Sequence, residues 1–543
     1  MSPGWRFLGR IFSVSITSGS FLLFALALTV LYFLVPKHGQ WMLLLLASAV
    51  FYCAAGLQYG AYILFTALST YCGARWIGRL AAQQQAYLKA NKEQLSREEK
   101  KAYKAGNKAR RKAVMIAALL LNFGLLAVFK YGDFVLTQLN RAAALLGSGP
   151  VHGPLGLIAP LGISFYTFQS MGYLVDVYWE KCAPEKNIAR MLLFVSFFPQ
   201  IIQGPISNFS QLAPQLYAPH SFSAARLGSG LQRMLWGFFK KLVIADTLAP
   251  YVQAVFANYT EYSGVAVLVG AFLYSAQIYA DFSGYMDIVC GLCEIWGIQL
   301  AENFQRPYFS KSIAEYWRRW HITLGEWFKT YLYYPVAVSH FARNAGKRWQ
   351  KRFGGSVGKT IPATVALLIV WLTTGLWHGA SWAYIAWGGV NGAFIIFSLW
   401  MEPVYLRWKQ ALHIQEDHWL WRAFQTLRTF CLVTVIKVLP EVGGLRRGLG
   451  LWKQVVTNWH LPETWQALFP YADTWINLAV IGGGLVLMLA ASLLQRKQPV
   501  RAFLMEKPMV LRYTIYFVLL GAILLFGCYG EGFDPQDFMY FKF

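Results

Sequence analysis

The sequence predicts an all-α polytopic membrane protein, with roughly 10–12 transmembrane helices and further re-entrant or interfacial helices around a central funnel or tunnel. Of its 543 residues, 56% are hydrophobic, 17% are aromatic and only 14% are charged, whereas about a quarter of the residues of a soluble protein carry charge. Apolar runs of about 20 residues, the length that spans a bilayer core, recur from end to end. Charged residues gather in the loops between these runs.

The apolar runs follow one another along a single chain. Candidate spans begin near Phe21, Trp41, Tyr59, Ala113, Ala159, Leu231, Val265, Ile361, Trp382, Phe424, Ile476 and Val510. We expect residues 1–74 to hold N-terminal transmembrane helices and residues 75–112 to form a basic cytoplasmic loop. A catalytic core should follow over residues 113–440. Residues 441–543 should hold the C-terminal helices and an aromatic tail.

The net charge of +24 comes largely from loops. The basic loops 75–112, 343–359 and 495–507 fit the positive-inside bias of membrane proteins and attraction to anionic lipid. We therefore place these loops in the cytoplasm and expect membrane lipid, rather than nucleic acid, as the partner of the basic surface. The seven cysteines give no disulfide framework, and we interpret them as packing residues.

Two stretches in the first half combine helix-breaking residues with buried polar groups. Residues 160–169 should begin a helix, and residues 197–205 contain prolines and a glycine that interrupt an apolar run. Irregular backbone at membrane depth is tolerated where it lines a cavity or lies within protein. Gln169 and Gln203 are therefore candidate pocket residues.

The apolar helix expected over 274–287 carries polar groups at membrane depth. Tyr279, Asp281 and Ser283 are candidate tunnel residues, and Asp287 lies further along. Buried carboxylates are costly unless they are paired. A structural ion pair or hydrogen-bond network explains the two aspartates, and a substrate path is the alternative. The nearest plausible cations in the sequence are Arg306, Arg318 and Arg319.

Residues 315–335 can be laid on one amphipathic helix that ends at Pro335. Trp317 and Trp320 then share a face with further apolar side chains. His321 lies at the edge of that face, where it either faces a cavity or packs among aromatic rings as a core histidine.

His378 lies in Gly-Leu-Trp-His-Gly-Ala-Ser-Trp, within a stretch apolar enough to lie inside a membrane. A titratable side chain at that depth is a candidate functional residue. Trp377 and Trp382 are expected to form a dry aromatic pocket around it. Such surroundings favour a neutral imidazole that can accept a proton. We find no Gly-x-Ser-x-Gly elbow and no convincing set of metal ligands.

Together these motifs resemble the membrane-bound O-acyltransferase family, and within it the bacterial branch that acts in alginate O-acetylation. The matching stretches are Pro160–Gln169, Tyr173–Tyr178, Phe197–Pro205, Tyr274–Gly284, Asn303-Phe304, Pro307-Tyr308, Tyr316–Leu324 and Gly375–Gly379. The resemblance implies that His378 is the family's catalytic histidine and that His321 is its second polar residue.

The resemblance also implies an activity. We expect O-acyl transfer, with an acetyl group, from a cytoplasmic thioester to an extracytoplasmic polysaccharide or cell-wall polymer. The donor would be acetyl-CoA or a carrier-protein thioester, with no tightly bound cofactor. The protein would be a multi-pass protein of the bacterial cytoplasmic (inner) membrane. Its partner would be an extracytoplasmic acyltransferase resembling SGNH serine esterases.

The C-terminal aromatic residues have two interpretations. The Phe-x-Tyr-x-x-Phe ending resembles a terminal motif of related systems, which implies Tyr540 as an acyl acceptor. The alternative is an interfacial aromatic anchor.

Three alternative functions stay open on the sequence alone. The transferred group could be D-alanyl or another short acyl chain. The protein could instead be a transporter or flippase for a polymer precursor, or a structural subunit that recruits a soluble enzyme. Substitution of His378 should abolish acyl transfer but leave transport largely intact.

Overall fold

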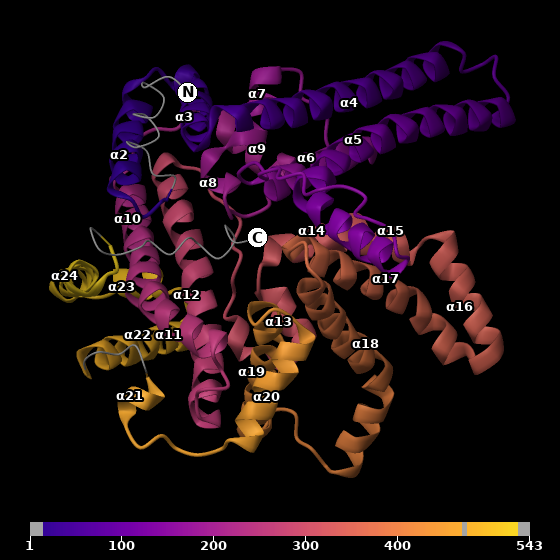
Figure 1. Ribbon diagram of the computed structural model, residues 1–543. Helices are drawn as coiled ribbons and strands as arrows, with labels where there is room; N and C mark the ends of the chain where they lie inside the picture. Colours follow the sequence, from indigo (N-terminus) through magenta and orange to yellow (C-terminus); the bar gives the residue numbers. More distant parts are fainter. Residues whose placement is uncertain (1–14, 470–474, 530–543) are drawn as a thin grey trace. The chain divides into compact units, whose positions relative to one another are not determined.

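The computed structural model describes residues 15–469 and 475–529 (Figure 1). These residues form helices, and the β-type pairing among them is limited to an isolated bridge between Phe304 and Trp320. The chain divides into two compact units. The first runs to Leu227 and includes residues 292–300, and the second comprises residues 228–291 and everything from Ala301 onward.

The first unit is built from helices joined by short turns. Its elements are α2 (Gly19–Leu34), the 3₁₀ turn η1 (Lys37–Gly39), α3 (Gln40–Ala55), α4 (Leu57–Ala90), α5 (Arg97–Leu145), α6 (Ile163–Tyr178), α7 (Ile188–Ser196), α8 (Phe198–Ile201) and α9 (Phe209–Tyr217).

The basic segment 75–112 lies in a long helical hairpin in which α4 and α5 run side by side (Figure 1). The second helix begins with a reciprocal cap. Ser96 Oγ accepts the backbone N–H of Glu99 at 3.2 Å, and the Glu99 carboxylate accepts the Ser96 N–H at 2.7 Å. This capping box satisfies two otherwise orphan donors at the start of α5. The segment expected to be a basic loop is therefore largely helical, with a turn between the end of α4 at Ala90 and the start of α5 at Arg97.

The stretch 197–205 is broken, as its prolines and glycine predict. α7 ends at Ser196 and α8 is a single short turn. Gly162 precedes α6 with a φ of 70°, and a side chain there would collide with the backbone carbonyl of Ile201. Only glycine suits both the left-handed backbone and this close approach. The role of this region in lining a cavity stays a prediction.

The second unit contains most of α10 and α12 and all later elements. Its elements are α10 (Ala224–Phe238), the π-helical segment η2 (Phe239–Ala245), α11 (Asp246–Ala257), α12 (Gly264–Trp296), η3 (Pro307–Phe309), α13 (Ile313–Arg319), α14 (Ile322–Phe328), the π-helical segment η4 (Lys329–Tyr333), α15 (Tyr334–Ala337), α16 (His340–Phe353), α17 (Gly355–His378), α18 (Trp382–Ala411), α19 (Trp419–Glu441), α20 (Leu445–Thr457), α21 (Trp465–Leu468), α22 (Trp475–Leu494), α23 (Val500–Met505) and α24 (Met509–Phe526).

Seven of the described helices are long and apolar enough to cross a membrane, namely α5, α12, α17, α18, α19, α22 and α24. This confirms the predicted class, an all-α polytopic membrane protein. The spans expected to begin near Ala159 and Leu231 form the shorter helices α6 and α10.

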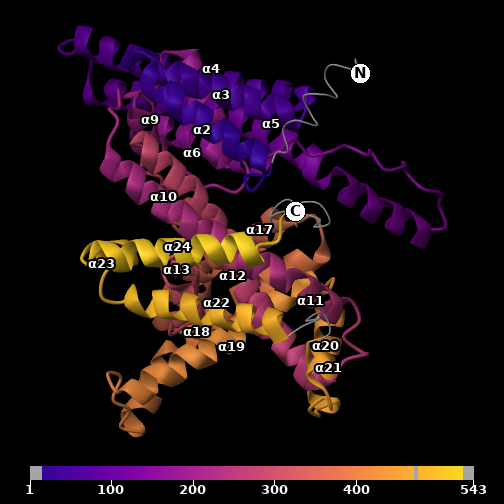
Figure 2. The ribbon, with the colours of Figure 1, turned by 90° about the vertical axis from the view of Figure 1, so that its left-hand side faces the viewer.

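α10 and α12 pack closely because glycines lie where they meet. A methyl group on Gly237 would lie only 2.7 Å from the carbonyl oxygen of Gly284. The adjoining η2 packs against α22 and α24, which lie alongside each other in Figure 2. Ile244, Met488 and Ile523 form part of this apolar contact. The close approach of α10 to α12 brings the polar side chains of α12 within reach of cations on α10 and η2.

α17 and α18 form a second tightly packed pair. A side chain at Gly375 would collide with the carbonyl oxygen of Tyr384, and a side chain at Gly388 would collide with that of Trp371. The small residues that surround His378 in the sequence therefore serve helix packing, and they fix the end of α17 against the start of α18.

Candidate active site

His378 is the last residue of α17 and is buried, with 8% of its surface exposed. Its Nδ1 lies 2.7 Å from the backbone carbonyl oxygen of Thr374, one turn earlier. Because a carbonyl oxygen can only accept a hydrogen bond, Nδ1 must carry the proton. In the neutral imidazole, Nε2 therefore holds the lone pair and can act as a base.

His321 lies at a break between α13 and α14, so the prediction of one continuous helix over 315–335 is wrong. Its backbone has φ 48° and ψ 51°, a left-handed conformation that residues other than glycine rarely adopt. The physical reason is pairing with a distant segment. Phe304 forms a bridge with Trp320, and the Ile322 N–H donates to the Asn303 carbonyl at 3.1 Å. A local helical pattern cannot reveal this pairing.

The helical run after the break also differs from the prediction at its far end. It passes from α14 through η4 into α15, so Pro335 does not end it. Pro335 lies in the first turn of α15, where the missing N–H of proline is tolerated.

Asn303 fixes the orientation of His321. Its side-chain oxygen accepts the Thr323 N–H at 3.0 Å and the Thr323 hydroxyl at 2.8 Å. Because a backbone N–H only donates, the atom it meets must be the amide oxygen of Asn303. The His321 Nδ1 lies 3.5 Å from the same oxygen, at the long end of hydrogen-bond distance. Nδ1 of His321 is therefore also the protonated nitrogen, and its Nε2 holds the lone pair.

The two histidines belong to a closed circuit of aromatic and imidazole rings. Neighbouring centroids in this circuit lie 4.8–6.4 Å apart. In order, the rings are those of Trp320, Tyr316, Trp317, Trp387, His378, Trp377, His321 and Phe282, which contacts Trp320 again. The Trp377 ring touches both imidazoles and so connects them.

His321 has an environment suited to a base. It is 2% exposed, and its burial, together with the nearby His378, lowers its pKa well below the ordinary value of 6.5. Burial disfavours the imidazolium because the charged form loses its hydration. The neutral form therefore prevails at neutral pH, with Nδ1 held by Asn303.

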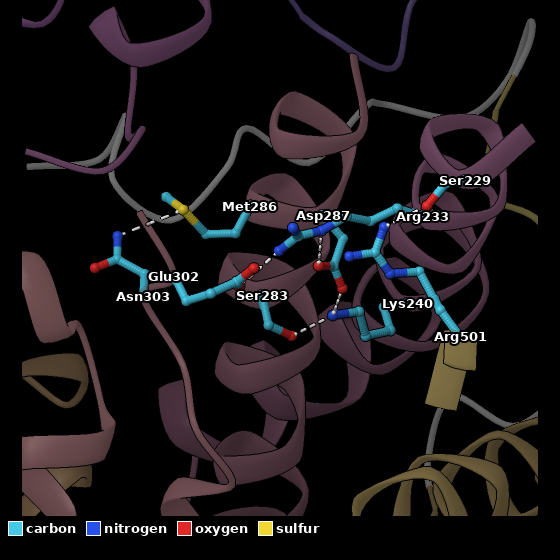
Figure 3. Close-up of polar contacts among 9 residues, drawn as sticks. All are labelled: Ser229, Arg233, Lys240, Ser283, Met286, Asp287, Glu302, Asn303 and Arg501. Carbon is cyan, nitrogen blue, oxygen red and sulfur yellow. Dashed lines mark hydrogen bonds and ion pairs between the residues drawn. The ribbon is translucent and has the colours of Figure 1, made fainter. Parts of the chain in front are cut away.

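An ion network anchors the segment that carries Asn303 (Figure 3). Asp287 on α12 binds Arg233 on α10 at 2.9 Å and Lys240 on η2 at 2.7 Å. Arg233 also binds Glu302 at 2.6 Å, and Lys240 donates to Ser283 at 2.7 Å. Glu302 directly precedes the residue that holds His321. The network thus ties the backbone of the site to two helices.

The cations paired with the buried aspartates are not those predicted. The predicted partners were Arg306, Arg318 and Arg319. Instead, Asp287 binds Arg233 and Lys240. Lys241 lies between Asp281, at 2.7 Å, and Asp246, at 2.8 Å. Both aspartates are therefore paired, as the cost of burying a carboxylate predicts, and a part of Asp281 in a tunnel stays a prediction. The sequence could not reveal the partners, because helix packing brings them together across roughly 40–50 residues of chain.

The remaining candidates differ in how close they lie to the histidines. Tyr279 contacts the Trp320 ring with centroids 6.2 Å apart. Trp382, at the start of α18, is 58% exposed and lies outside the ring circuit. Gln169 and Gln203 are buried in the first unit, where Gln169 donates to the Phe194 carbonyl at 2.7 Å.

Two further expectations concern the tail and metals. Tyr540 lies outside the described residues. Within residues 15–469 and 475–529, no group of three or more metal-ligating side chains is positioned to hold an ion.

Sequence reasoning gave no role to Asn303 or to Lys437, which contacts Trp320. Lys437 could have been found, because it lies in an apolar stretch of α19 and the argument applied to His378 applies equally to a buried lysine. Asn303 carries no comparable local signal, since its role depends on pairing with the break at His321.

Comparisons with known proteins identify the family of the chain. Residues 185–348 match the model of the MBOAT, membrane-bound O-acyltransferase family. A probable alginate O-acetylase AlgI of Pseudomonas aeruginosa is 34% identical over 440 residues, which cover 80% of this chain and 73% of that protein. One from Azotobacter vinelandii is 33% identical over 369 residues, or 67% of this chain and 64% of the relative. A peptidoglycan O-acetyltransferase of Helicobacter pylori is 34% identical over 304 residues, or 51% and 54%. The chain therefore belongs to the membrane-bound O-acyltransferase family, and its enzyme class is that of O-acyltransferases.

Proposed function

We propose that this protein is an O-acetyltransferase that takes an acetyl group from a cytoplasmic thioester and supplies it for O-acetylation of an extracytoplasmic polysaccharide or cell-wall polymer. The observation that carries the proposal is the pair of buried histidines, each with Nδ1 bound to an oxygen acceptor and Nε2 left as the basic atom. The names of the relatives, an alginate O-acetylase and a peptidoglycan O-acetyltransferase, support acetyl as the group and a polymer as the acceptor.

The chemistry needs a base and an environment that excludes water. His378 Nε2 removes the proton from the acceptor hydroxyl as the hydroxyl oxygen attacks the thioester carbonyl carbon. The new C–O bond forms, the C–S bond breaks, and the leaving thiolate takes the proton from the imidazolium. His321 orients the donor or acceptor or shares the proton. The aromatic circuit keeps water from hydrolysing the thioester.

The location and partners belong to the same proposal. We place the protein in the bacterial cytoplasmic membrane, with the donor, acetyl-CoA or a carrier-protein thioester, bound from the cytoplasm. Since the acceptor polymer lies outside, a separate extracytoplasmic acyltransferase of the serine-esterase kind would complete the transfer. Deletion of the gene for such a partner should abolish polymer acetylation, and unchanged acetylation would contradict this step.

Tyr540 is proposed as the hydroxyl that first receives the acetyl group. The alternative, an aromatic anchor, needs no hydroxyl. Tyr540→Phe should therefore abolish polymer acetylation if the residue carries the acetyl group, whereas retained acetylation would leave the tail as an anchor.

The decisive experiment is His378→Ala, measured as the acetyl content of the surface polymer in cells and as thiol release from acetyl-CoA by the purified protein. Loss of a general base should lower turnover by roughly 10²–10⁴-fold, and His321→Ala should lower it by a smaller or comparable factor. His413→Ala is a matched control for His321→Ala, because both histidines have a positive φ, 49° at His413, but His413 is exposed. Wild-type acetylation in the His378 variant, at normal membrane abundance, would refute the assignment.

A further inference from the structure

Lys437 on α19 is a buried lysine beside the candidate active site. Only 6% of its surface is exposed. Its Nζ lies 2.8 Å from the Tyr308 hydroxyl and 3.8 Å from the centre of the Trp320 ring. The rings of Tyr308 and Tyr316 lie at 4.8 and 5.2 Å. Three aromatic side chains thus enclose the amino group.

The Lys437 amino group is balanced by these aromatic groups rather than by a carboxylate. Among the described residues, no ion pair involves Lys437, and Glu441, one turn later, accepts the Tyr274 hydroxyl at 3.3 Å. The Tyr308 hydroxyl donates its own proton to the Ser275 carbonyl. Its oxygen must therefore accept from Lys437, which makes Nζ the donor in this contact.

Burying an amino group costs free energy unless it finds partners. The Tyr308 hydroxyl and the face of the Trp320 ring are the partners of Lys437. Trp320 directly precedes His321, whose backbone is in the left-handed region. Such conformations persist only where the surroundings hold them from several sides.

We propose that Lys437 is a positioning residue for His321: its amino group fixes the Trp320 ring and so holds the strained Trp320-His321 turn in the geometry used for catalysis. This inference rests on the proposed function, because one of the measured quantities is the rate of the proposed reaction. Asn303 and Thr323 hold the turn from one side by hydrogen bonds. Lys437 holds it from the other through Trp320. The turn is thus fixed at both of its ends.

The test compares Lys437→Met, which approximates the chain length but removes the amino group, with Lys437→Arg, which keeps N–H donors at the end of the side chain. The measured quantities are kcat and KM for acetyl-CoA with the purified full-length protein. The Met variant should lose roughly ten- to a hundredfold in kcat with KM unchanged, as expected for a small misplacement of a catalytic group. The Arg variant should recover most of the loss. Lys453→Met, which removes an exposed lysine on α20, should behave as wild type.

A second readout does not depend on the donor. Modification of His321 by diethyl pyrocarbonate, followed by mass spectrometry, should be faster in the Met variant than in wild type or the Arg variant, because the turn is no longer held. Tyr308→Phe removes only the hydroxyl acceptor and should give a smaller effect of the same kind. It also provides the test if the Met variant does not fold.

The possible failures are distinguishable. Loss of turnover in His378→Ala, together with wild-type kcat and unchanged His321 modification in Lys437→Met, would overturn the role of Lys437 and leave the proposed function standing. Wild-type turnover in His378→Ala would overturn the proposed function, and the modification rates would then still decide whether Lys437 holds the turn. Equal loss in the Met and Arg variants would also overturn the inference, because an N–H donor facing Tyr308 and Trp320 would then not be the feature that matters.

Discussion

Asn303 is the residue whose replacement should separate the support of His321 from its chemistry. Its side-chain oxygen accepts hydrogen bonds from the Thr323 N–H, the Thr323 hydroxyl and Nδ1 of His321. Asn303→Ala removes this acceptor. The hydroxyl can rotate to another partner, whereas the backbone N–H and the Nδ1–H each lose the hydrogen bond that Asn303 accepts. At about 1–3 kcal/mol for each unsatisfied buried donor, with the long contact to Nδ1 near the low end, the expected destabilisation is about 2–4 kcal/mol.

Asn303→Asp gives a different and sharper signature. The carboxylate keeps an oxygen for both Thr323 donors, but it places a negative charge beside His321. An adjacent opposite charge favours the imidazolium and should raise the pKa of His321 by about one to three pH units. In the wild type this pKa is well below 6.5, so the imidazole is neutral at pH 7. In the Asp variant, activity should already decline at a higher pH as the solution is acidified.

The assay is thiol release from acetyl-CoA between pH 5 and pH 8, combined with thermal unfolding of the detergent-purified protein. The Ala variant should melt earlier and lose activity across the whole range. The Asp variant should melt close to the wild type and show its acid limb moved to higher pH. Coincident pH profiles for the wild type and the Asp variant, or wild-type stability in the Ala variant, would refute the assignment of Asn303 as the partner of His321.

Three further outcomes follow from the same structure. Asp287→Ala leaves Lys240 without its carboxylate and Arg233 with Glu302 alone, and it should destabilise the protein by about 3–5 kcal/mol. The loss would be seen as a lower melting temperature, whereas wild-type melting would mean that the ion network is not structural. Gly375→Leu places a side chain against the carbonyl of Tyr384. It should sharply reduce the folded fraction measured by size-exclusion chromatography, and an unchanged monodisperse peak would contradict the packing of α17 on α18. Because the pKa of His321 is lowered in the folded state, its contribution to stability is complete above pH 6.5 and falls below it, where the unfolded chain binds the extra proton. A His321→Ala variant with the same pH dependence of melting as the wild type would contradict this last point.

Features encoded in local sequence were predictable. Long apolar runs predicted the membrane class, prolines and a glycine predicted the break near Pro199, and the apolar surroundings of His378 drew attention to that residue. Features that depend on pairing between distant segments were not. The left-handed turn at His321 exists because residues 303–305 pair with it, and the 3.6-residue periodicity of the surrounding sequence predicts an uninterrupted helix instead. The partners of Asp287 are likewise set by close packing of glycines between α10 and α12.

The supports of the two histidines differ in kind, and this difference suggests a division of labour. His378 donates a hydrogen bond from Nδ1 to a carbonyl of its own helix, and this bond orients the ring through the secondary structure of α17. His321 occupies a costly backbone conformation that persists only because Asn303, the ion network behind Glu302 and the Lys437–Trp320 contact all converge on it. Strain that is held from several sides is typical of residues whose exact placement matters to function. The placement of His321 therefore depends on contacts from segments that lie far apart in the sequence. A residue that only packed among aromatic rings would not need this support, and the Asn303 and Lys437 variants test that distinction from opposite sides of the same turn.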